Sequence, residues 1–213
     1  MIWCLPVLAY FLGSISFAWI AGRLKGIDLR EHGSKNLGAT NAGRVLGRRW
    51  FFIVFALDVG KGLRAVLAAR FLPASLGSDS HALLPIATAT AVILGHVFTC
   101  FHRFTGGKAV ATSLGVLIAL MPAVAGIAFA AWLVAWIAGW AAAGLPKATA
   151  VGPASVLAAL VAPLAHLRLA DDPWGADLPR TIFILLLGAL VVIKHRSNLA
   201  KLFAGTPPAA GSP

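Results

Sequence analysis

The residues best suited to chemistry lie in one polar run, residues 33–44, between two apolar segments. Its glycines, at 33, 38 and 43, let backbone N–H groups approach a ligand closely. Lipid tails offer no hydrogen bonds, so the run must face water or a polar ligand. Its side chains combine positive charge with hydrogen-bonding groups, an inventory suited to holding a phosphate. The members are Gly33, Ser34, Lys35, Asn36, Gly38, Thr40, Asn41 and Arg44.

A second polar run occupies residues 95–113 and holds Gly106-Gly107-Lys108 immediately before a predicted helix. Such a helix start carries free N–H groups and the positive end of the helix dipole, and the lysine adds a full charge, so we expect it to face an anion. A plain turn with a lysine that anchors the helix at the lipid interface explains the same pattern, and the Walker A spacing is missing. Thr112 and Ser113 follow one turn further on.

A third polar run, residues 195–206, comes directly after the last apolar segment. By itself it is either a basic cap beside the membrane or part of a site. His195 and Asn198 would share a helical face, because residues three apart are neighbours on a helix. Arg196 adds charge beside them.

Three other polar residues lie within or at the ends of apolar segments. Asp58 and Lys61 occur inside one such segment, where ionisable groups are costly and are usually paired or functional. We expect either a structural pair or a layer that supports the site. His96, after Gly95, is either a buried structural histidine or a member of the site.

Composition places these runs in a membrane protein. Hydrophobic residues make up 59% of the 213 and charged residues only 12%, against about 25% charged residues in soluble domains. The net charge of +11 is spread over short loops between apolar segments, a distribution that orients membrane proteins and does not indicate nucleic acid. Cys4 and Cys100 have no spacing typical of a disulfide framework or a metal site.

The apolar segments predict an all-α integral membrane protein with about seven transmembrane helices. A helix needs about 20 residues to cross the hydrocarbon core, and single spans are predicted at 2–22, 50–72, 82–101, 148–167 and 181–193. Residues 109–144 are too long for one span, and Pro122 divides them into a short helix at 110–120 and a full one at 123–143. We expect one domain over 1–205 and a disordered tail at 206–213.

Positive charge sets the orientation of these spans. Lysine and arginine collect at 23–49, 103–108, 147 and 194–201, whereas the opposite loops hold aspartates. The positive-inside rule places the N-terminus outside and the C-terminus in the cytoplasm. All three polar runs, with short or re-entrant helices, then reach the cytoplasmic face, and we expect one basic, glycine-rich pocket there. The runs contain no nucleophile pair, carboxylate dyad or metal cluster, so chemistry would rest on positioning and charge stabilisation.

The chain resembles the bacterial acyl-phosphate:glycerol-3-phosphate acyltransferases, the PlsY family, through three long motifs in order. The family's GS-x-N-[IL]-GATN-x-x-R loop fits residues 33–44, its GH-x-F and GGK segment fits 95–112, and its HR-x-N-[IL] ending fits 195–206. Its second-helix Asp-x-x-Lys-Gly resembles residues 58–62. The chain departs from the family by having Thr99 for proline, Ala109 for glycine and Pro207 for glutamate.

The resemblance implies a seven-helix enzyme of the bacterial cytoplasmic (inner) membrane, with its active site facing the cytoplasm. It would move a fatty acyl group from acyl phosphate to the 1-hydroxyl of sn-glycerol 3-phosphate, giving lysophosphatidic acid and phosphate, the first step of phospholipid biosynthesis. No metal or other cofactor is expected; the partners would be the two substrates and membrane lipids, with an acyl-phosphate-producing enzyme upstream. The alternative is a transporter of a phosphorylated small solute, which would show inverted repeats and polar half-helices at the midplane.

Carried over to this chain, the motifs supply the expected site. The catalytic residues would be Ser34, Arg44, Lys108, His195 and Asn198. The residues that bind substrate or phosphate would be Gly33, Asn36, Gly38, Thr40, Asn41, Lys61, Gly95, His96, Gly106, Gly107, Thr112, Ser113 and Arg196. Acyl phosphate is already activated, so the 1-hydroxyl can attack directly. Its proton would go either to His195 or to the substrate's own phosphate. The motifs contain no carboxylate, which favours the phosphate as the acceptor.

Overall fold

The structure is a computed structural model that describes residues 3–71 and 78–203. These residues form helices and connecting loops, with no strand among them, as predicted for an all-α protein. The chain divides into two compact units, Met1–Pro122 (unit 1) and Ala123–Pro213 (unit 2), which are described separately. The predicted tail at 206–213 lies outside the described residues, and one domain over 1–205 stays a prediction.

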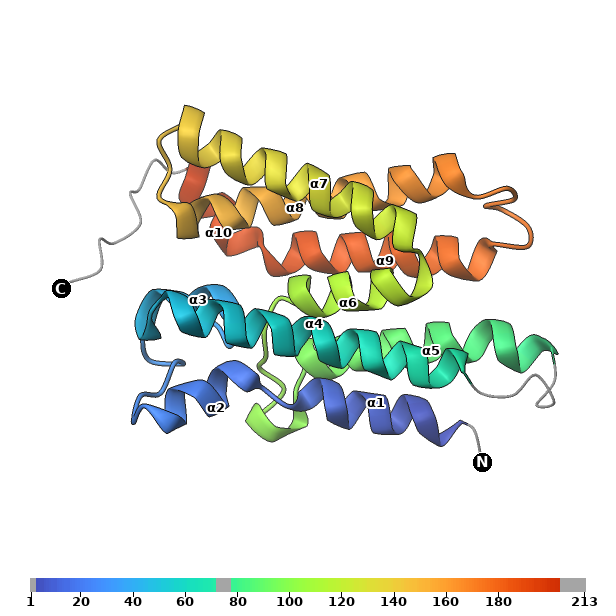
Figure 1. The fold of residues 1–213 in the computed structure, drawn as a ribbon, viewed down its shortest axis with the longest axis horizontal. Helices are drawn as coiled ribbons and strands as arrows, with labels where there is room; N and C mark the ends of the chain where they lie inside the picture. The colour runs from blue at the N-terminus through green and yellow to red at the C-terminus, as the bar shows by residue number, and fades with distance from the viewer. Residues whose placement is uncertain (1–2, 72–77, 204–213) are drawn as a thin grey trace. The chain divides into compact units, whose positions relative to one another are not determined.

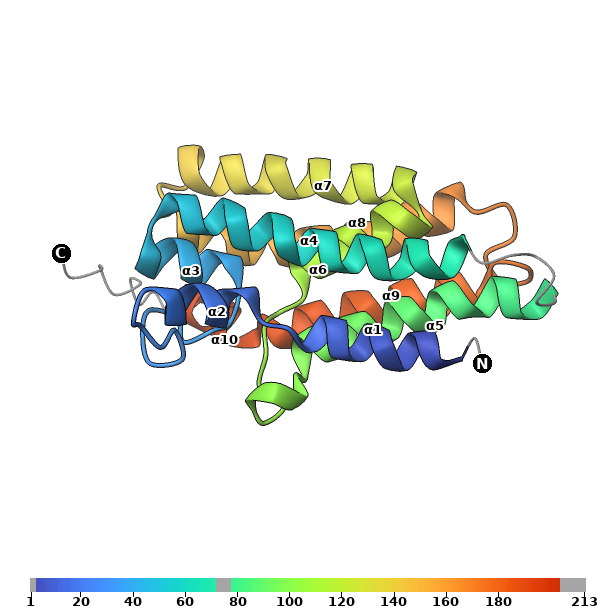
Figure 2. The same ribbon diagram turned by 60° about the horizontal axis from the view of Figure 1, so that its bottom comes forward.

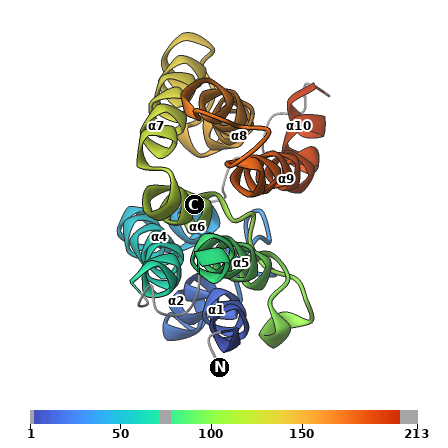
Figure 3. The same cartoon turned by 90° about the vertical axis from the view of Figure 1, so that its right-hand side faces the viewer.

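Unit 1 contains two pairs of packed helices. Helix α1 packs along α5, and α4 packs along α6, as Figure 1 and the end-on view of Figure 3 show. The short helices α2 and α3 pack against each other and against α4. A 3-10 turn, Cys100–His102, follows α5. The helices of unit 1 are α1 (Cys4–Ser14), α2 (Phe17–Leu24), α3 (Ala39–Leu46), α4 (Arg48–Arg70), α5 (Ser78–Val97) and α6 (Val110–Leu120).

Glycines bring these helices close together. A Cβ added to Gly13 of α1 would overlap the carbonyl oxygen of Val92 in α5, and one added to Gly95 of α5 would overlap a carbonyl oxygen of α1. Gly62 of α4 and Gly115 of α6 are packed against each other's helix in the same way. In lipid there is no hydrophobic drive between helices, so close van der Waals contact at small residues supplies much of the attraction.

The first predicted span, 2–22, corresponds to a helical stretch, Cys4–Leu24, that is long and apolar enough to cross a membrane but is broken: α1 ends at Ser14 and α2 begins at Phe17. Ser16 caps α2, because its side chain accepts a hydrogen bond from the backbone N–H of Trp19 at 3.2 Å. Figure 2 shows the link between the two helices. Beyond the break, α2 shares a hydrophobic core with α3 and α4. That core consists of Ala18, Ala21, Leu29, Leu37, Ala39, Ala42 and Val54.

The other predicted spans correspond to helices. The bounds of α6, Val110–Leu120, are those predicted, and Pro122 begins the next helix, where proline needs no N–H partner. With 11 residues α6 is about 16 Å long, about half of a membrane core. Four helical stretches of the described residues are long and apolar enough to cross a membrane: Cys4–Leu24, Leu83–His102, Pro122–Ala142 and Lys147–Leu169. A total of seven spans stays a prediction.

Unit 2 begins with α7 (Pro122–Ile137), which a π-helical turn (Ala138–Ala142) extends, and continues with α8 (Lys147–Leu169), α9 (Leu178–Lys194) and α10 (Arg196–Phe203). Helices α8 and α9 pack together. The indole N–H of Trp132 in α7 donates to the hydroxyl of Ser155 in α8 at 3.2 Å. The rings of Phe129, Trp132, Trp136 and Trp140 stack in a row along α7.

Candidate active site

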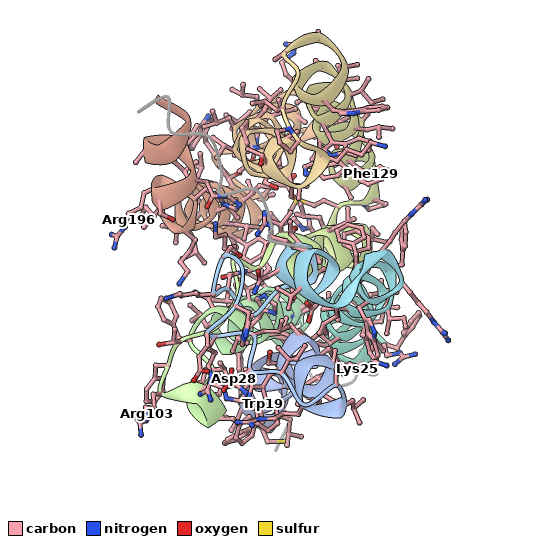
Figure 4. All side chains as sticks on the ribbon, turned by 90° about the vertical axis from the view of Figure 1, so that its left-hand side faces the viewer. Trp19, Lys25, Asp28, Arg103, Phe129 and Arg196 are labelled. Atoms are coloured by element: carbon pink, nitrogen blue, oxygen red, sulfur yellow. The ribbon has the colours of Figure 1, made fainter. Side chains whose placement is uncertain are left out.

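The first polar run lies on the loop from α2 to α3, and a carboxylate shapes the start of this loop. The guanidinium of Arg30 donates to Asp28 at 2.9 Å (Nε to Oδ1) and 2.6 Å (Nη2 to Oδ2), and Arg23 lies 3.4 Å away. These arginines hold the pKa of the Asp28 carboxyl well below its usual range, so it stays charged. The Nδ1 of His32 lies 2.9 Å from the carbonyl oxygen of Asp28, which fixes the next turn. Figure 4 labels Asp28 at this end of unit 1.

Asn41 of α3 holds the rest of the loop. Its Nδ2 donates to the carbonyl oxygens of Leu29 and His32, both at 3.1 Å, and its Oδ1 accepts from the backbone N–H of Ser34 at 2.7 Å. Only 1% of Asn41 is exposed. We predicted Asn41 as a phosphate-binding residue, but both N–H donors and the amide oxygen are engaged by the loop backbone. In this structure Asn41 therefore places Ser34, and its role in phosphate binding stays a prediction.

Gly33 has a conformation that only glycine adopts easily. Its φ is 61°, and a Cβ would overlap Oδ1 of Asn41. The predicted residues Asn36, Gly38 and Thr40 follow at the start of α3, where the carbonyl oxygen of Gly38 accepts from the backbone N–H of Asn41 at 3.1 Å.

Ser34 and Arg44, the predicted catalytic residues of this run, both lie exposed on unit 1. The described residues include no ion-pair partner for Arg44. Nearby atoms desolvate its guanidinium and lower the pKa, yet an arginine remains cationic at neutral pH. An exposed cation on α3 and an exposed hydroxyl on the loop that Asn41 of α3 holds are groups suited to an anionic ligand.

The second run corrects one expectation about its backbone. The N–H of Gly106 donates to the carbonyl oxygen of Val97 at 3.1 Å, and the N–H of Gly107 donates to that of His96 at 3.0 Å. These two groups, which we expected to be free for a phosphate, are used to fold the loop back on the end of α5. A Cβ on Gly107 would overlap Nε2 of His96 and would lie 3.0 Å from the carbonyl oxygen of Leu37. The first and second runs therefore touch at Gly107.

Lys108, Thr112 and Ser113 surround the start of α6. Lys108 is half-buried, and Ala109 after it has a φ of 61°. Thr112 and Ser113 are buried, and neither hydroxyl has a hydrogen-bond partner within residues 3–71 and 78–203. Buried hydroxyls normally have a partner, so these two are suited to a polar ligand at the start of the helix.

Lys61 has partners other than the phosphate we predicted for it. Its Nζ lies 2.9 Å from Oδ1 of Asp58 and donates to the carbonyl oxygens of Gly13 at 3.0 Å and Ile15 at 2.8 Å. Two of the three N–H groups of the ammonium thus donate to backbone carbonyls, and the contact with Asp58 is an ion pair. The structural pair that we weighed for Asp58 and Lys61 is formed, and both side chains are almost wholly buried. His96 adds to it, with Nδ1 3.6 Å from Oδ1 of Asp58.

Gly95, which we also predicted to bind phosphate, serves packing. A Cβ on Gly95 would overlap the carbonyl oxygen of Tyr10 and would lie 2.9 Å from the backbone nitrogen of Ser14. Helix α1 thus covers it, and a role of Gly95 in phosphate binding stays a prediction.

The third run lies in unit 2, at the junction of α9 and α10. His195 is 3% exposed, and its Nδ1 lies 2.8 Å from the carbonyl oxygen of Val191. A carbonyl can only accept, so Nδ1 carries a hydrogen, and in the neutral ring the lone pair is then on Nε2. The backbone N–H of Asn198 donates to the carbonyl oxygen of His195 at 2.9 Å. Arg196 is exposed and points away from the helices in Figure 4. Shared action of this run with the other two stays a prediction.

Sequence reasoning missed Thr99, whose hydroxyl donates to the carbonyl oxygen of Ser14 at 2.7 Å and is wholly buried. The signal was available, since Thr99 stands where the family has proline, but its partner lies 85 positions away. No group of three histidine, cysteine or acidic residues that could hold a metal occurs in the part of the chain that the structure describes.

Comparison with known proteins gives consistent matches over the whole chain. A family described as "Glycerol-3-phosphate acyltransferase" matches residues 3–205. Relatives of that name from Pseudomonas paraeruginosa and Aquifex aeolicus are 42% and 39% identical, over 96% and 94% of this chain and 97% and 95% of theirs.

Two solved structures match as well. Both are of PlsY (YgiH), an integral membrane glycerol 3-phosphate acyltransferase. Its glycerol 3-phosphate form is 36% identical with a TM-score of 0.82, over 99% of this chain and 96% of that one. Its lysophosphatidic acid form is 34% identical with a TM-score of 0.78, over 99% and 95%.

Proposed function

The chain belongs to the glycerol-3-phosphate acyltransferase family, and from this we propose that it transfers a fatty acyl group from acyl phosphate to the 1-hydroxyl of sn-glycerol 3-phosphate. The products are lysophosphatidic acid and inorganic phosphate, and the protein is a multi-pass membrane enzyme of phospholipid biosynthesis. The observation that carries the proposal is the match, over 99% of this chain, to an acyltransferase structure in its glycerol 3-phosphate form.

Unit 1 offers the groups that bind a phosphorylated substrate. Ser34 and Arg44 lie exposed on the loop and helix that Asn41 joins, and Lys108 stands at the start of α6. A phosphate dianion needs cations and hydrogen-bond donors from several directions. The contact of Gly107 with the carbonyl oxygen of Leu37 brings the two runs that hold these residues together. We assign Ser34, Arg44 and Lys108 to the phosphates of the two substrates.

The reaction needs no protein nucleophile. The 1-hydroxyl oxygen attacks the acyl carbon, the bond from that carbon to the phosphate oxygen breaks, and inorganic phosphate leaves. Charge develops on the acyl oxygen during the attack, and one well-placed donor contributes roughly 3 kcal/mol to its stabilisation. The proton of the hydroxyl goes to an oxygen of the substrate's phosphate or to Nε2 of His195, which the Nδ1–Val191 contact leaves in the basic tautomer. We assign Asn198 to the same reaction because it belongs to the same sequence motif as His195.

For the membrane arrangement, we propose seven spans with the N-terminus outside and the C-terminus and active site on the cytoplasmic side of the inner membrane. The four apolar stretches that are long enough to cross support several passes. The basic residues of the α2–α3 loop, including Arg23 and Arg30, support a cytoplasmic position for that loop.

Purified protein in detergent tests the proposal directly. We expect phosphate release from acyl phosphate to depend on added glycerol 3-phosphate, with lysophosphatidic acid as the lipid product by mass spectrometry. Acyl-CoA in place of acyl phosphate serves as the control donor and should give no product. Heat-inactivated protein that matched the native rate would overturn the proposal. Uptake of glycerol 3-phosphate into liposomes without acyl transfer would instead support the transporter.

A further inference from the structure

We infer that Asp58, Lys61 and Thr99 form a positioning device that fixes the break in the first span and, through it, both phosphate-suited runs of unit 1. This inference rests on the proposed function. In this structure the partners of the three residues are backbone carbonyls, His96 and, for Asp58 and Lys61, each other.

The break in the first span exposes backbone groups that need partners. A helix end leaves carbonyl oxygens without an intrahelical N–H, and in lipid no water replaces it. Here three consecutive carbonyls at the end of α1 have donors from distant parts of unit 1: Lys61 of α4 donates to Gly13 and Ile15, and Thr99, just after α5, donates to Ser14. Without these donors a continuous helix would have the lower free energy, because it satisfies the three carbonyls internally. The donors therefore stabilise the broken arrangement.

Charge strengthens the same arrangement. The carboxyl end of a helix carries partial negative charge, which a lysine at that point complements. The Nζ of Lys61 also lies 5.5 Å from the ring centroid of Phe17, the first residue of α2. Asp58 balances the charge at 2.9 Å, so the buried ammonium is paired as well as hydrogen-bonded.

Asp58 connects this helix end to the second run. Its Oδ1 lies 3.6 Å from Nδ1 of His96. The other ring nitrogen, Nε2, is so close to Gly107 that a Cβ on this glycine would overlap it. The carbonyl oxygen of His96 also accepts a hydrogen bond from the backbone N–H of Gly107. The orientation of His96 thus sets the position of the turn immediately before Lys108.

The break connects to the first run through α2. Ala18 and Ala21 of α2 belong to the same buried core as Leu29 and Leu37 of the loop. A change in the angle between α1 and α2 therefore moves the loop that carries Ser34. The three residues act on both runs through the backbone at the end of α1 and through His96, so they are positioning residues.

Thr99→Val is the sharpest test, because it keeps the shape of the side chain and removes one donor. Its matched control is Thr90→Val in α5, the helix that ends two residues before Thr99; the hydroxyl of Thr90 donates within its own helix, to the carbonyl oxygen of Ile86. We expect Thr99→Val to raise the KM for glycerol 3-phosphate by about fivefold or more with kcat within about twofold, since displaced loops lose ground-state contacts. Thr90→Val should match the wild type in both constants.

Hydrogen exchange followed by mass spectrometry gives a readout that does not depend on activity. Thr99→Val and Asp58→Asn should speed exchange in peptides covering 12–24 and 103–109 and leave those covering 150–165 unchanged. Lys61→Met should have the larger effect, and Lys61→Arg should recover part of it. Should Lys61→Met fail to fold, the other two variants decide.

The outcomes are distinct. Folded Thr99→Val and Asp58→Asn proteins with wild-type KM and wild-type exchange would overturn the positioning role. Faster exchange spread evenly over the whole chain would overturn it too, because that is general destabilisation. If the wild type transferred no acyl group, the proposed function would fail, and the exchange pattern would still judge whether these residues hold the two runs.

Discussion

Gly62 of α4 lies so close to α6 that a Cβ on this glycine would overlap the carbonyl oxygen of Thr112. Two residues earlier in the same helix, Gly60 has no atom within 4 Å of the same position. The two glycines share a helix and differ in what faces them. Alanine substitutions at the two positions therefore distinguish the packing cost of an added methyl group from its effect on helix propensity.

Gly62→Ala should destabilise unit 1 by about 1–3 kcal/mol, the usual cost of overpacking, because backbone cannot move aside as a flexible side chain can. Gly60→Ala should be neutral or stabilising by up to about 1 kcal/mol, since alanine favours a helix over glycine. Thermal unfolding in detergent, with both variants under the same conditions, measures the difference. Equal losses of stability would contradict the close contact of α4 with α6.

Replacement of Asn41 should damage activity through the loop. Asn41→Ala removes the partners of Leu29, His32 and Ser34, and each lost hydrogen bond costs about 1 kcal/mol. Asn41→Asp keeps the acceptor for the N–H of Ser34 but loses both donors, so it should fall between Asn41→Ala and the wild type. We expect kcat/KM for glycerol 3-phosphate to follow that order. If Asn41→Asp retained full activity, anchoring by the two donors would not matter.

Removal of either predicted phosphate cation should abolish most acyl transfer. Arg44→Ala and Lys108→Ala should each lower kcat/KM by about a hundredfold or more, because a lost charge-assisted hydrogen bond costs about 1.5–3 kcal/mol and weaker transition-state stabilisation adds to it. Arg49→Ala, at an exposed position at the start of α4, serves as the charge-matched control. Rates measured by phosphate release check the prediction. A loss for Arg49→Ala equal to that for Arg44→Ala would point to net charge instead of a site.

His195→Ala separates the two possible proton acceptors. If Nε2 of His195 takes the proton, kcat should fall by about 10²–10⁴, the usual range for a general base. If the substrate's phosphate takes it, kcat should change little once substrate saturates. Steady-state rates over a wide range of glycerol 3-phosphate give the answer. Near-normal turnover would exclude the histidine base, and His195→Gln provides a variant that keeps hydrogen-bonding capacity.

Much of the fold could be predicted from the lengths of the apolar segments and from the proline that separates two of them. Pro122 placed the boundary of α6, and the bounds 110–120 agree with the structure, because a proline stops one helix and can begin the next. The break after Ser14 could not be predicted in this way. Its local signal is the cap at Ser16, whereas Lys61, which satisfies the carbonyls, is 46 positions from Ile15.

For the candidate site, the sequence motifs name residues but do not give their contacts. Motif spacing identified Gly106 and Gly107, yet their N–H groups serve the end of α5. The amide of Asn41 likewise serves its own loop. A glycine or an amide in a polar run fits a ligand and a loop backbone equally well, so only the position of neighbouring carbonyls distinguishes them.

The break in the first span also constrains the order of biogenesis. Translation delivers residues 13–15 to the membrane well before their donors exist: Lys61 is 48 positions behind Gly13, and Thr99 is 85 behind Ser14. While the nascent chain is shorter than this, those carbonyls have to be satisfied within one uninterrupted helix or by water at the translocon. The bend is therefore completed only after the third apolar segment has been synthesised, so the beginning of the polypeptide matures later than its place in the sequence implies.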